Sequence, residues 1–159
     1  AVDVAFSFEV AGSGFSKSTG NNVVATENTT ESERTGVVTI TQSESDEVDT
    51  INLSQTAATV TYDYTLTTDP TSLSFVAAGE TKVFGVISNK QKKVNGKNSG
   101  SPIVVDYTTV VSGEGFTKGS SEYSVIAAAN TGAERTGQAV VTANEGGKTA
   151  TITLTQLGV

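Results

Sequence analysis

Apolar residues alternate with hydroxylated or charged residues along most of this chain. In residues 149–155 the side chains of Ala150, Ile152 and Leu154 share one face, and threonines occupy the other. A period of two residues is typical of a β-strand with one buried face. The same alternation predicts further strands at residues 49–55, 59–66, 72–76, 81–87, 103–111, 123–128 and 137–143. No longer segment shows a helical period, so the sequence predicts an all-β protein.

Turn-forming residues separate these runs. Residues 144–147, Asn-Glu-Gly-Gly, predict a hairpin turn, because glycine adopts a positive φ at little cost. Residues 43–47, Ser-Glu-Ser-Asp-Glu, predict a longer, acidic turn. About seven short strands separated by such turns are typical of an immunoglobulin-like antiparallel β-sandwich. We therefore expect that architecture.

The pattern also repeats itself at a spacing of about 101 residues. The matching segments are residues 12–17 with 113–118, 33–36 with 134–137, and 51–55 with 152–156. An internal repeat marks a module within an array. The sequence therefore predicts a tandem repeat, with one complete unit at residues 57–159 preceded by the C-terminal half of another at residues 1–56.

Residues 1–56 are expected to be incomplete alone, since half a sandwich leaves an apolar face open. Ile51 and Leu53 should point inward on that face, as the equivalents of Ile152 and Leu154. Upstream sequence, the neighbouring unit or a strand from another chain could complete it. We favour a longer parent chain.

Composition narrows the chemistry. Cysteine and histidine are absent, which removes disulfides, thiolate zinc sites and the commonest general base. Residues 1–56 carry nine acidic side chains against two basic ones, whereas residues 57–159 are neutral. An acidic or neutral surface disfavours nucleic acid, and no apolar run is long enough to cross a bilayer. We expect no enzyme and no cofactor, although the sequence leaves open a pair of carboxylates as in glycosidases.

Two stretches resemble a known family. Residues 69–89 open with Asp-Pro-Thr-Ser-Leu-Ser-Phe, and residues 129–137 and 147–156 read Ala-Asn-Thr-Gly-Ala-Glu-Arg-Thr-Gly and Gly-Lys-Thr-Ala-Thr-Ile-Thr-Leu-Thr-Gln. These motifs are similar to the two ends of the BACON domains of gut Bacteroidetes and their phages. The resemblance implies an immunoglobulin-like sandwich, usually non-catalytic and in tandem, found in glycan-degrading surface proteins and phage virion proteins. Family members commonly carry a tryptophan soon after the Ser-Asn pair; here residues 90–102 hold no aromatic residue.

The candidate contact residues are four lysines and two tyrosines. They are Lys90, Lys92, Lys93, Lys97, Tyr62 and Tyr64. The lysines fall in a predicted loop, which could contact acidic glycans, phosphates or the acidic half of a neighbouring subunit, or could be a flexible solvated loop. The tyrosines share one strand face and could stack on sugars or pack across strands.

Two repeated or charged motifs have a simpler interpretation. Glu134-Arg135-Thr-Gly137 and its counterpart at residues 33–36 could clamp a ligand carboxylate. We favour a structural tie between a loop and a strand, with the glycine at an unusual backbone angle. The acidic residues 44–49 could bind calcium, but a solvated turn is favoured because they lack the ordered spacing of a calcium loop.

These observations predict a non-catalytic, tandem immunoglobulin-like module of an extracellular, bacterial cell-surface or phage virion protein. It would act as a structural spacer or adhesion element with weak glycan binding. Its partners would be adjacent repeats or other subunits of the same assembly, and host or mucin glycans. The alternative is a dedicated carbohydrate-binding module attached to a glycoside hydrolase.

Overall fold

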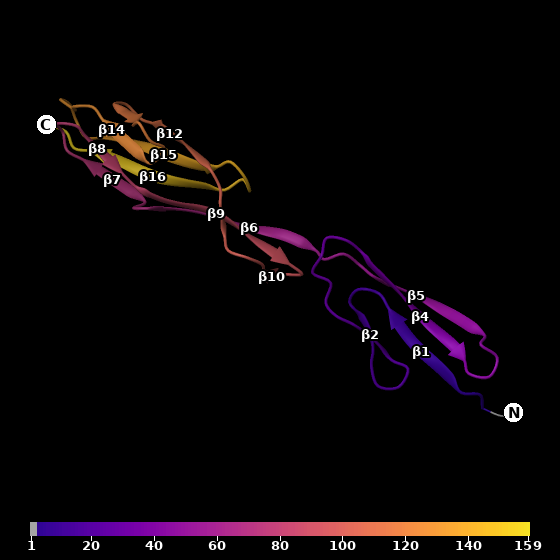
Figure 1. The fold of residues 1–159 in the computed structure, drawn as a ribbon. Coiled ribbons are helices and arrows are strands. Elements are labelled where there is room, and N and C mark those ends of the chain that lie inside the picture. Colours follow the sequence, from indigo (N-terminus) through magenta and orange to yellow (C-terminus); the bar gives the residue numbers. More distant parts are fainter. Residues whose placement is uncertain (1–2) are drawn as a thin grey trace. The chain divides into compact units, whose positions relative to one another are not determined.

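The computed structural model describes residues 3–159, which form sixteen β-strands and no helix (Figure 1). The all-β prediction is therefore confirmed. The chain divides into two compact units. Unit 1 comprises Ala1–Thr61 and Lys93–Asn98, and unit 2 comprises Tyr62–Lys92 and Ser99–Val159.

The first layer of unit 2 is a four-stranded sheet. Its strand order is β12 (Tyr107–Ser112), β15 (Arg135–Ala143), β16 (Thr149–Gln156) and β7 (Ser72–Phe75). The first three strands are antiparallel, whereas β7 runs parallel to β16, with Leu73 opposite Leu154. The threonine-rich strand predicted from the alternation is β16, and its Ile152 and Leu154 have no exposed surface.

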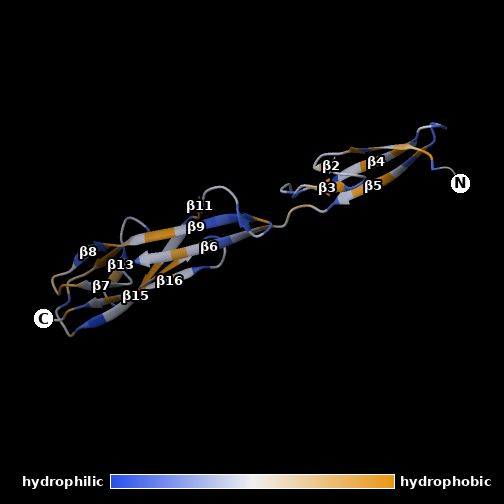
Figure 2. Cartoon of the chain, turned by 90° about the horizontal axis from the view of Figure 1, so that it is seen from below, coloured by the Kyte–Doolittle hydropathy of each residue, from blue (hydrophilic) through white to orange (hydrophobic). Residues whose placement is uncertain are grey.

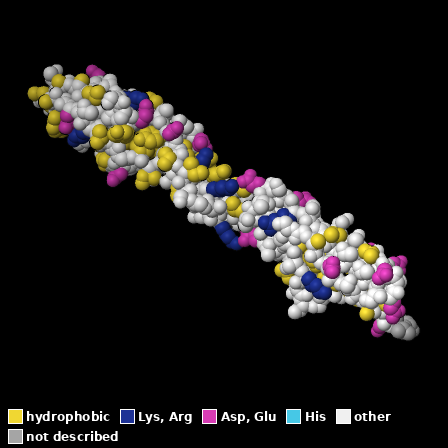
Figure 3. Space-filling view, in the orientation of Figure 1, with side chains coloured by type: hydrophobic (Ala, Val, Ile, Leu, Met, Phe, Trp, Pro, Cys, Tyr) yellow, Lys and Arg dark blue, Asp and Glu magenta, His cyan; other side chains and the backbone are white. Residues whose placement is uncertain are grey.

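The second layer of unit 2 is a three-stranded sheet. Its order is β13 (Phe116–Lys118), β14 (Ser124–Ala127) and β8 (Glu80–Val83). Phe75 and Leu154 of the first layer belong to the same buried cluster as Phe116 and Val125 of the second. Apolar side chains from two antiparallel sheets that meet in one core define a β-sandwich, as the sequence predicts. Figure 2 shows the apolar stretches of these strands, and in Figure 3 hydrophobic side chains gather on the visible face of unit 2.

Four further strands form a separate sheet. They are β6 (Val60–Asp69), β9 (Gly85–Val94), β10 (Lys97–Asn98) and β11 (Ile103–Val104), with β9 paired to each of the others. Asn95 and Gly96, at φ 49° and 79°, form the turn between β9 and β10. Asn-Gly with two positive φ values is the preferred two-residue hairpin turn. The prediction of a loop at residues 90–97 is therefore wrong, because these lysines lie on a β-hairpin.

Two predicted strands are interrupted in the structure. The strand expected at residues 81–87 is split between β8 and β9 at Phe84, which is buried and whose backbone N–H donates to the carbonyl of Tyr123. The strand expected at residues 103–111 is split between β11 and β12, next to the buried Val105. In both places an apolar side chain turns into the core, and the chain changes from one sheet to another.

Unit 1 reproduces part of this pattern. It has a three-stranded sheet and a two-stranded ladder: β1 (Phe6–Ala11), β4 (Arg34–Gln42) and β5 (Val48–Gln55) in that order, and β2 (Phe15–Lys17) with β3 (Val23–Ala25). Arg34 pairs with Gln55 as Arg135 pairs with Gln156. The registers therefore make β1, β4, β5, β2 and β3 the counterparts of β12, β15, β16, β13 and β14.

Within residues 3–159, unit 1 has no strand in the positions of β7 and β8. Ile51 is consequently 50% exposed and Leu53 is only half-buried, although both were expected to be covered. Val23, the register counterpart of the fully buried Val125, is 36% exposed. The inner face of unit 1 is thus partly open to solvent.

Candidate functional site

The repeated Arg-Thr-Gly motif forms a hydrogen-bond network inside unit 2. Arg135 Nε donates to Oε1 of the fully buried Gln156 at 2.9 Å, and Arg135 Nη2 donates to the carbonyl of Ala128 at 2.8 Å. Gln156 Nε2 in turn donates to the carbonyls of Val76 and Ala128, at 2.9 and 2.8 Å. The network joins the ends of β7, β14 and β16. These atoms satisfy one another, as buried polar groups must, so the motif acts as a structural tie.

The glycine of this motif has a different role from the one expected. Gly137 is not among the positive-φ residues, so the prediction of an unusual backbone angle is wrong. A Cβ at Gly137 would lie 2.8 Å from the Phe116 ring and 2.5 Å from the carbonyl oxygen of Ser112. The glycine therefore allows the ring of Phe116 to pack directly on the backbone of β15.

A buried asparagine in each unit holds the loop before this motif. Asn130 Nδ2 donates to the carbonyls of Ala133 and Leu157, at 2.7 and 3.0 Å. Asn28 makes the corresponding bonds to Ser32 and Thr56, at 2.9 and 2.8 Å. The sequence repeats an Asn-Thr pair at both places, which could have revealed a loop-closing residue.

Three of the candidate contact residues come together in unit 2. Lys90 Nζ forms an ion pair with Glu145 Oε2 at 2.6 Å and lies 5.5 Å from the centroid of the Tyr62 ring. The Tyr62 and Tyr64 rings have centroids 6.5 Å apart and are tilted by 47°. We call Tyr62, Tyr64, Lys90 and Glu145 the tyrosine–lysine surface.

The hairpin turn between β15 and β16 supports this surface. A Cβ at Gly146 would lie 2.2 Å from the Tyr64 ring, so the ring rests directly on the turn backbone. Glu145 extends from the same turn to Lys90, and its hydrogen bond raises the pKa of Lys90 above the usual value. Tyr62 remains 42% exposed. The sequence did not identify Glu145 or Gly146 as part of a site, because they lie far from Tyr62 and Lys90 along the chain.

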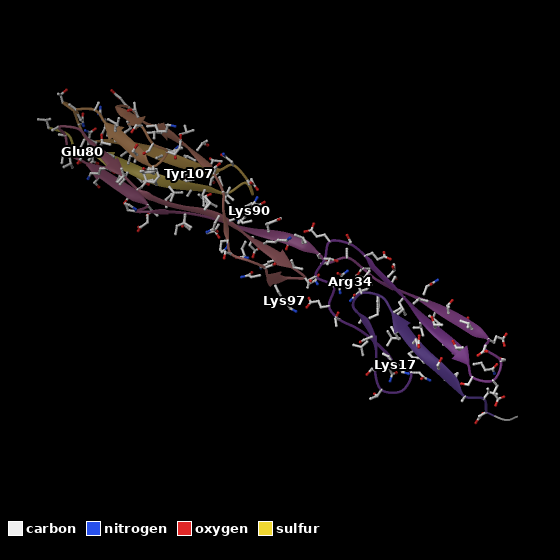
Figure 4. The ribbon with its side chains drawn as sticks, in the orientation of Figure 1. Lys17, Arg34, Glu80, Lys90, Lys97 and Tyr107 are labelled. Atoms are coloured by element: carbon white, nitrogen blue, oxygen red, sulfur yellow. The ribbon has the colours of Figure 1, made fainter. Side chains whose placement is uncertain are left out.

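The remaining lysines do not belong to this surface. Lys97, on β10, forms an ion pair with Glu27 at 2.9 Å, and both residues lie in unit 1 (Figure 4). Asn95 Nδ2 also donates to Glu27, at 3.0 Å. The hydrogen bond from Lys97, and then that from Asn95, lowers the pKa of Glu27 below its usual value. Lys92 and Lys93 follow on β9.

The other candidate sites stay as turns and strands. In the acidic turn, the Ser45 hydroxyl bonds the side chain of Gln42, and Asp46 takes a positive φ of 53°. No group of three or more acidic side chains within residues 3–159 is arranged to hold a metal ion. In the same range, no helix is long and apolar enough to cross a membrane.

The geometry defines a β-sandwich unit with a small aromatic and cationic surface. A family model, BACON, described as "Putative binding domain, N-terminal", matches residues 97–157. The predicted resemblance to the BACON family is confirmed over these residues. The match lies in the part of the chain that contains β12 to β16.

Other comparisons add little. No curated protein matches this chain. Among solved structures, the chain is similar to an endo-fucoidan hydrolase, MfFcnA4_H294Q, from glycoside hydrolase family 107, at 9% identity and a TM-score of 0.34. The alignment covers 96% of this chain and 24% of the hydrolase. A likeness at this level carries no argument about function.

Proposed function

We propose that this chain is a non-catalytic β-sandwich module that serves as a spacer or adhesion element and binds glycans weakly through the tyrosine–lysine surface. The observation that carries the proposal is the position of Lys90, which lies against the exposed Tyr62 ring and is held there by Glu145. An aromatic face can cover the C–H face of a sugar ring, and the adjacent charged groups can bond its hydroxyls. The BACON match at residues 97–157, to a binding-domain family, supports a binding role.

The spacer role is supported by the use of the repeated polar side chains. Asn130, Arg135 and Gln156 direct their hydrogen bonds to loops and strand ends of their own unit. Residues that repeat in a module usually meet a requirement of its fold. The residues that differ between the units, such as Tyr62 and Lys90, are then the ones available for contacts.

The cellular setting is part of the same proposal. The resemblance to BACON domains supports a place on a bacterial cell surface, in an extracellular protein or in a phage virion. Adjacent repeats or other subunits of the same assembly would be its permanent partners, and host or mucin glycans its transient ones. A dedicated carbohydrate-binding module of a glycoside hydrolase is the alternative outcome of the following test.

Glycan binding should be measured on the full chain, by glycan array and then by calorimetry with mucin and capsular glycans. We expect a dissociation constant of about 1 mM or weaker, at the lower limit of specific recognition. Tyr62→Ala should abolish this binding, whereas Tyr123→Ala, which removes another exposed tyrosine (49% exposed), should leave it unchanged.

Two results would change this conclusion. Binding that survives Tyr62→Ala and Lys90→Ala would place any glycan site elsewhere. A dissociation constant of about 10 µM or tighter for one glycan would favour the dedicated carbohydrate-binding module over the spacer.

A further inference from the structure

The strongest unassigned feature is the open edge of β5 in unit 1. In unit 2 the corresponding edge of β16 is covered by β7, in the parallel register Thr153–Ser72, Leu154–Leu73, Thr155–Ser74 and Gln156–Phe75. Gly36 faces Leu53 on β5 as Gly137 faces Leu154 on β16. The residues of β5 that would receive such a partner are therefore Asn52, Leu53, Ser54 and Gln55. An uncovered strand edge presents unpaired backbone groups and readily accepts another strand.

The apolar side chains on the inner face of unit 1 also lack a cover. Ile51, on β5, is 50% exposed, whereas its counterpart Ile152 is fully buried. Opposite it, Val23 on β3 corresponds to Val125, which β8 covers in unit 2 by pairing with β14. The same two missing strands thus account for exposure on both sides of the face.

A buried polar atom marks the same place. In unit 2, Gln156 donates to the carbonyl of Val76, directly after β7, and accepts a hydrogen bond from Arg135. In unit 1, Gln55 Nε2 donates to the carbonyl of Thr26 at 2.9 Å, but its Oε1 is buried with no hydrogen-bond partner within residues 3–159. Buried polar atoms are normally paired. The network at the end of β5 is therefore incomplete where the end of a β7-like strand would lie.

We propose that unit 1 docks an extended strand–turn–strand segment with the pattern of residues 72–83, provided by a polypeptide stretch outside residues 3–159. Its first strand would run parallel to β5, with two apolar side chains, spaced like Leu73 and Phe75, on the inner face. Its second strand would pair with β3. A basic residue at the position of Lys82 would suit the acidic residues 1–56, which carry nine acidic side chains against two basic ones.

A second copy of this chain is the less suitable donor. Its own β7 is paired with β16, and Leu73 and Phe75 are buried in the core of unit 2. Withdrawal of that strand would open the core of the donor to fill the face of the acceptor. A separate segment of the same sequence pattern has no such cost.

The test is binding of a synthetic peptide with the sequence of residues 69–84 to the full chain, followed by fluorescence anisotropy and amide hydrogen exchange. We expect saturable binding and slower exchange at residues 52–55. A peptide with the substitutions Leu73→Asp and Phe75→Asp should not bind. In the protein, Ile51→Asp should weaken binding at least about tenfold. Thr50→Asp, on the opposite face of the same strand, should change it little.

A fused version provides a second measurement that does not depend on peptide solubility. Residues 69–84 joined by a Gly-Ser linker to the N-terminus should raise the unfolding temperature of unit 1, and the doubly substituted fusion should not. Absence of both effects would overturn the proposal. Self-association of the full chain that the peptide cannot displace would overturn it as well, by identifying a second copy as the occupant. Glycan binding at the tyrosine–lysine surface is independent of either result.

Discussion

Ile152 and Ile51 hold the same register position in two sheets built from nearly the same sequence, yet one is fully buried and the other is half exposed. The strands themselves do not account for the difference, since both alternate in the same way. In unit 2 the strands β7 and β8 cover the inner face, whereas unit 1 has no equivalent within the described residues. Alternation therefore decides which face of a strand is apolar, but a second layer decides whether that face stabilises the fold.

The largest expected effect comes from removing these matched isoleucines. Ile152→Ala should lower the free energy of unfolding of unit 2 by about 2–5 kcal/mol, because it leaves a cavity in a packed core. Ile51→Ala should cost less than about 1 kcal/mol in unit 1, since much of the side chain is already in water. Denaturant unfolding followed by residue-resolved hydrogen exchange separates the two units. Equal costs would mean that unit 1 is covered in solution.

A smaller difference is expected for the matched glutamines. Gln156→Ala should destabilise unit 2 by about 1–3 kcal/mol, because the Arg135 side chain and the Val76 carbonyl lose their partners. Gln55→Ala should have a weaker effect, as one of its polar atoms is already unpaired. Thermal unfolding of the two variants and of the double variant provides the comparison. A larger loss for Gln55→Ala would contradict the incomplete network proposed for unit 1.

The smallest effect concerns the ion pairs. Lys97 lowers the pKa of Glu27, so the pair contributes stability at neutral pH and loses it as the pH falls through the lowered pKa. Lys97→Gln should move the pKa of Glu27 back up towards its usual value, as measured by NMR titration of the carboxyl carbon. Lys90→Gln, which removes the partner of Glu145 instead, is the matched control and should leave Glu27 unchanged. An unaltered Glu27 in Lys97→Gln would show that the pair does not form in solution.

The strands were predictable because their signal is local. Ile152 and Leu154 alternate with threonine, and the turn at Gly146 and Gly147 carries glycines where φ is positive. The β9–β10 hairpin was missed because its lysines suggested a solvated loop, although the Asn95-Gly96 pair was a usable signal. Figure 2 shows this change in character along β9, which is apolar at its start and hydrophilic towards its end.

The candidate site was predictable only in part, because contacts between distant residues do not appear in a local pattern. The shared strand face of Tyr62 and Tyr64 follows from their spacing. The contact of Lys90 with Glu145 depends on how β9 and the β15–β16 turn are brought together by the fold. The exposure of Ile51 likewise depends on strands elsewhere, which is why its inward position did not imply burial.

The parallel pairing of β7 with β16 has a consequence for how unit 2 is made. Ser72 lies opposite Thr153, so the strand that closes the sheet is synthesised long after the strand that it must hold. Pairings between residues so far apart in sequence form slowly, since a long loop must close before they contribute. We expect Leu73 and Phe75 to leave the ribosome without their final partner and to be protected only when β16 emerges. Chaperone capture and premature proteolysis should therefore be concentrated in that interval of translation.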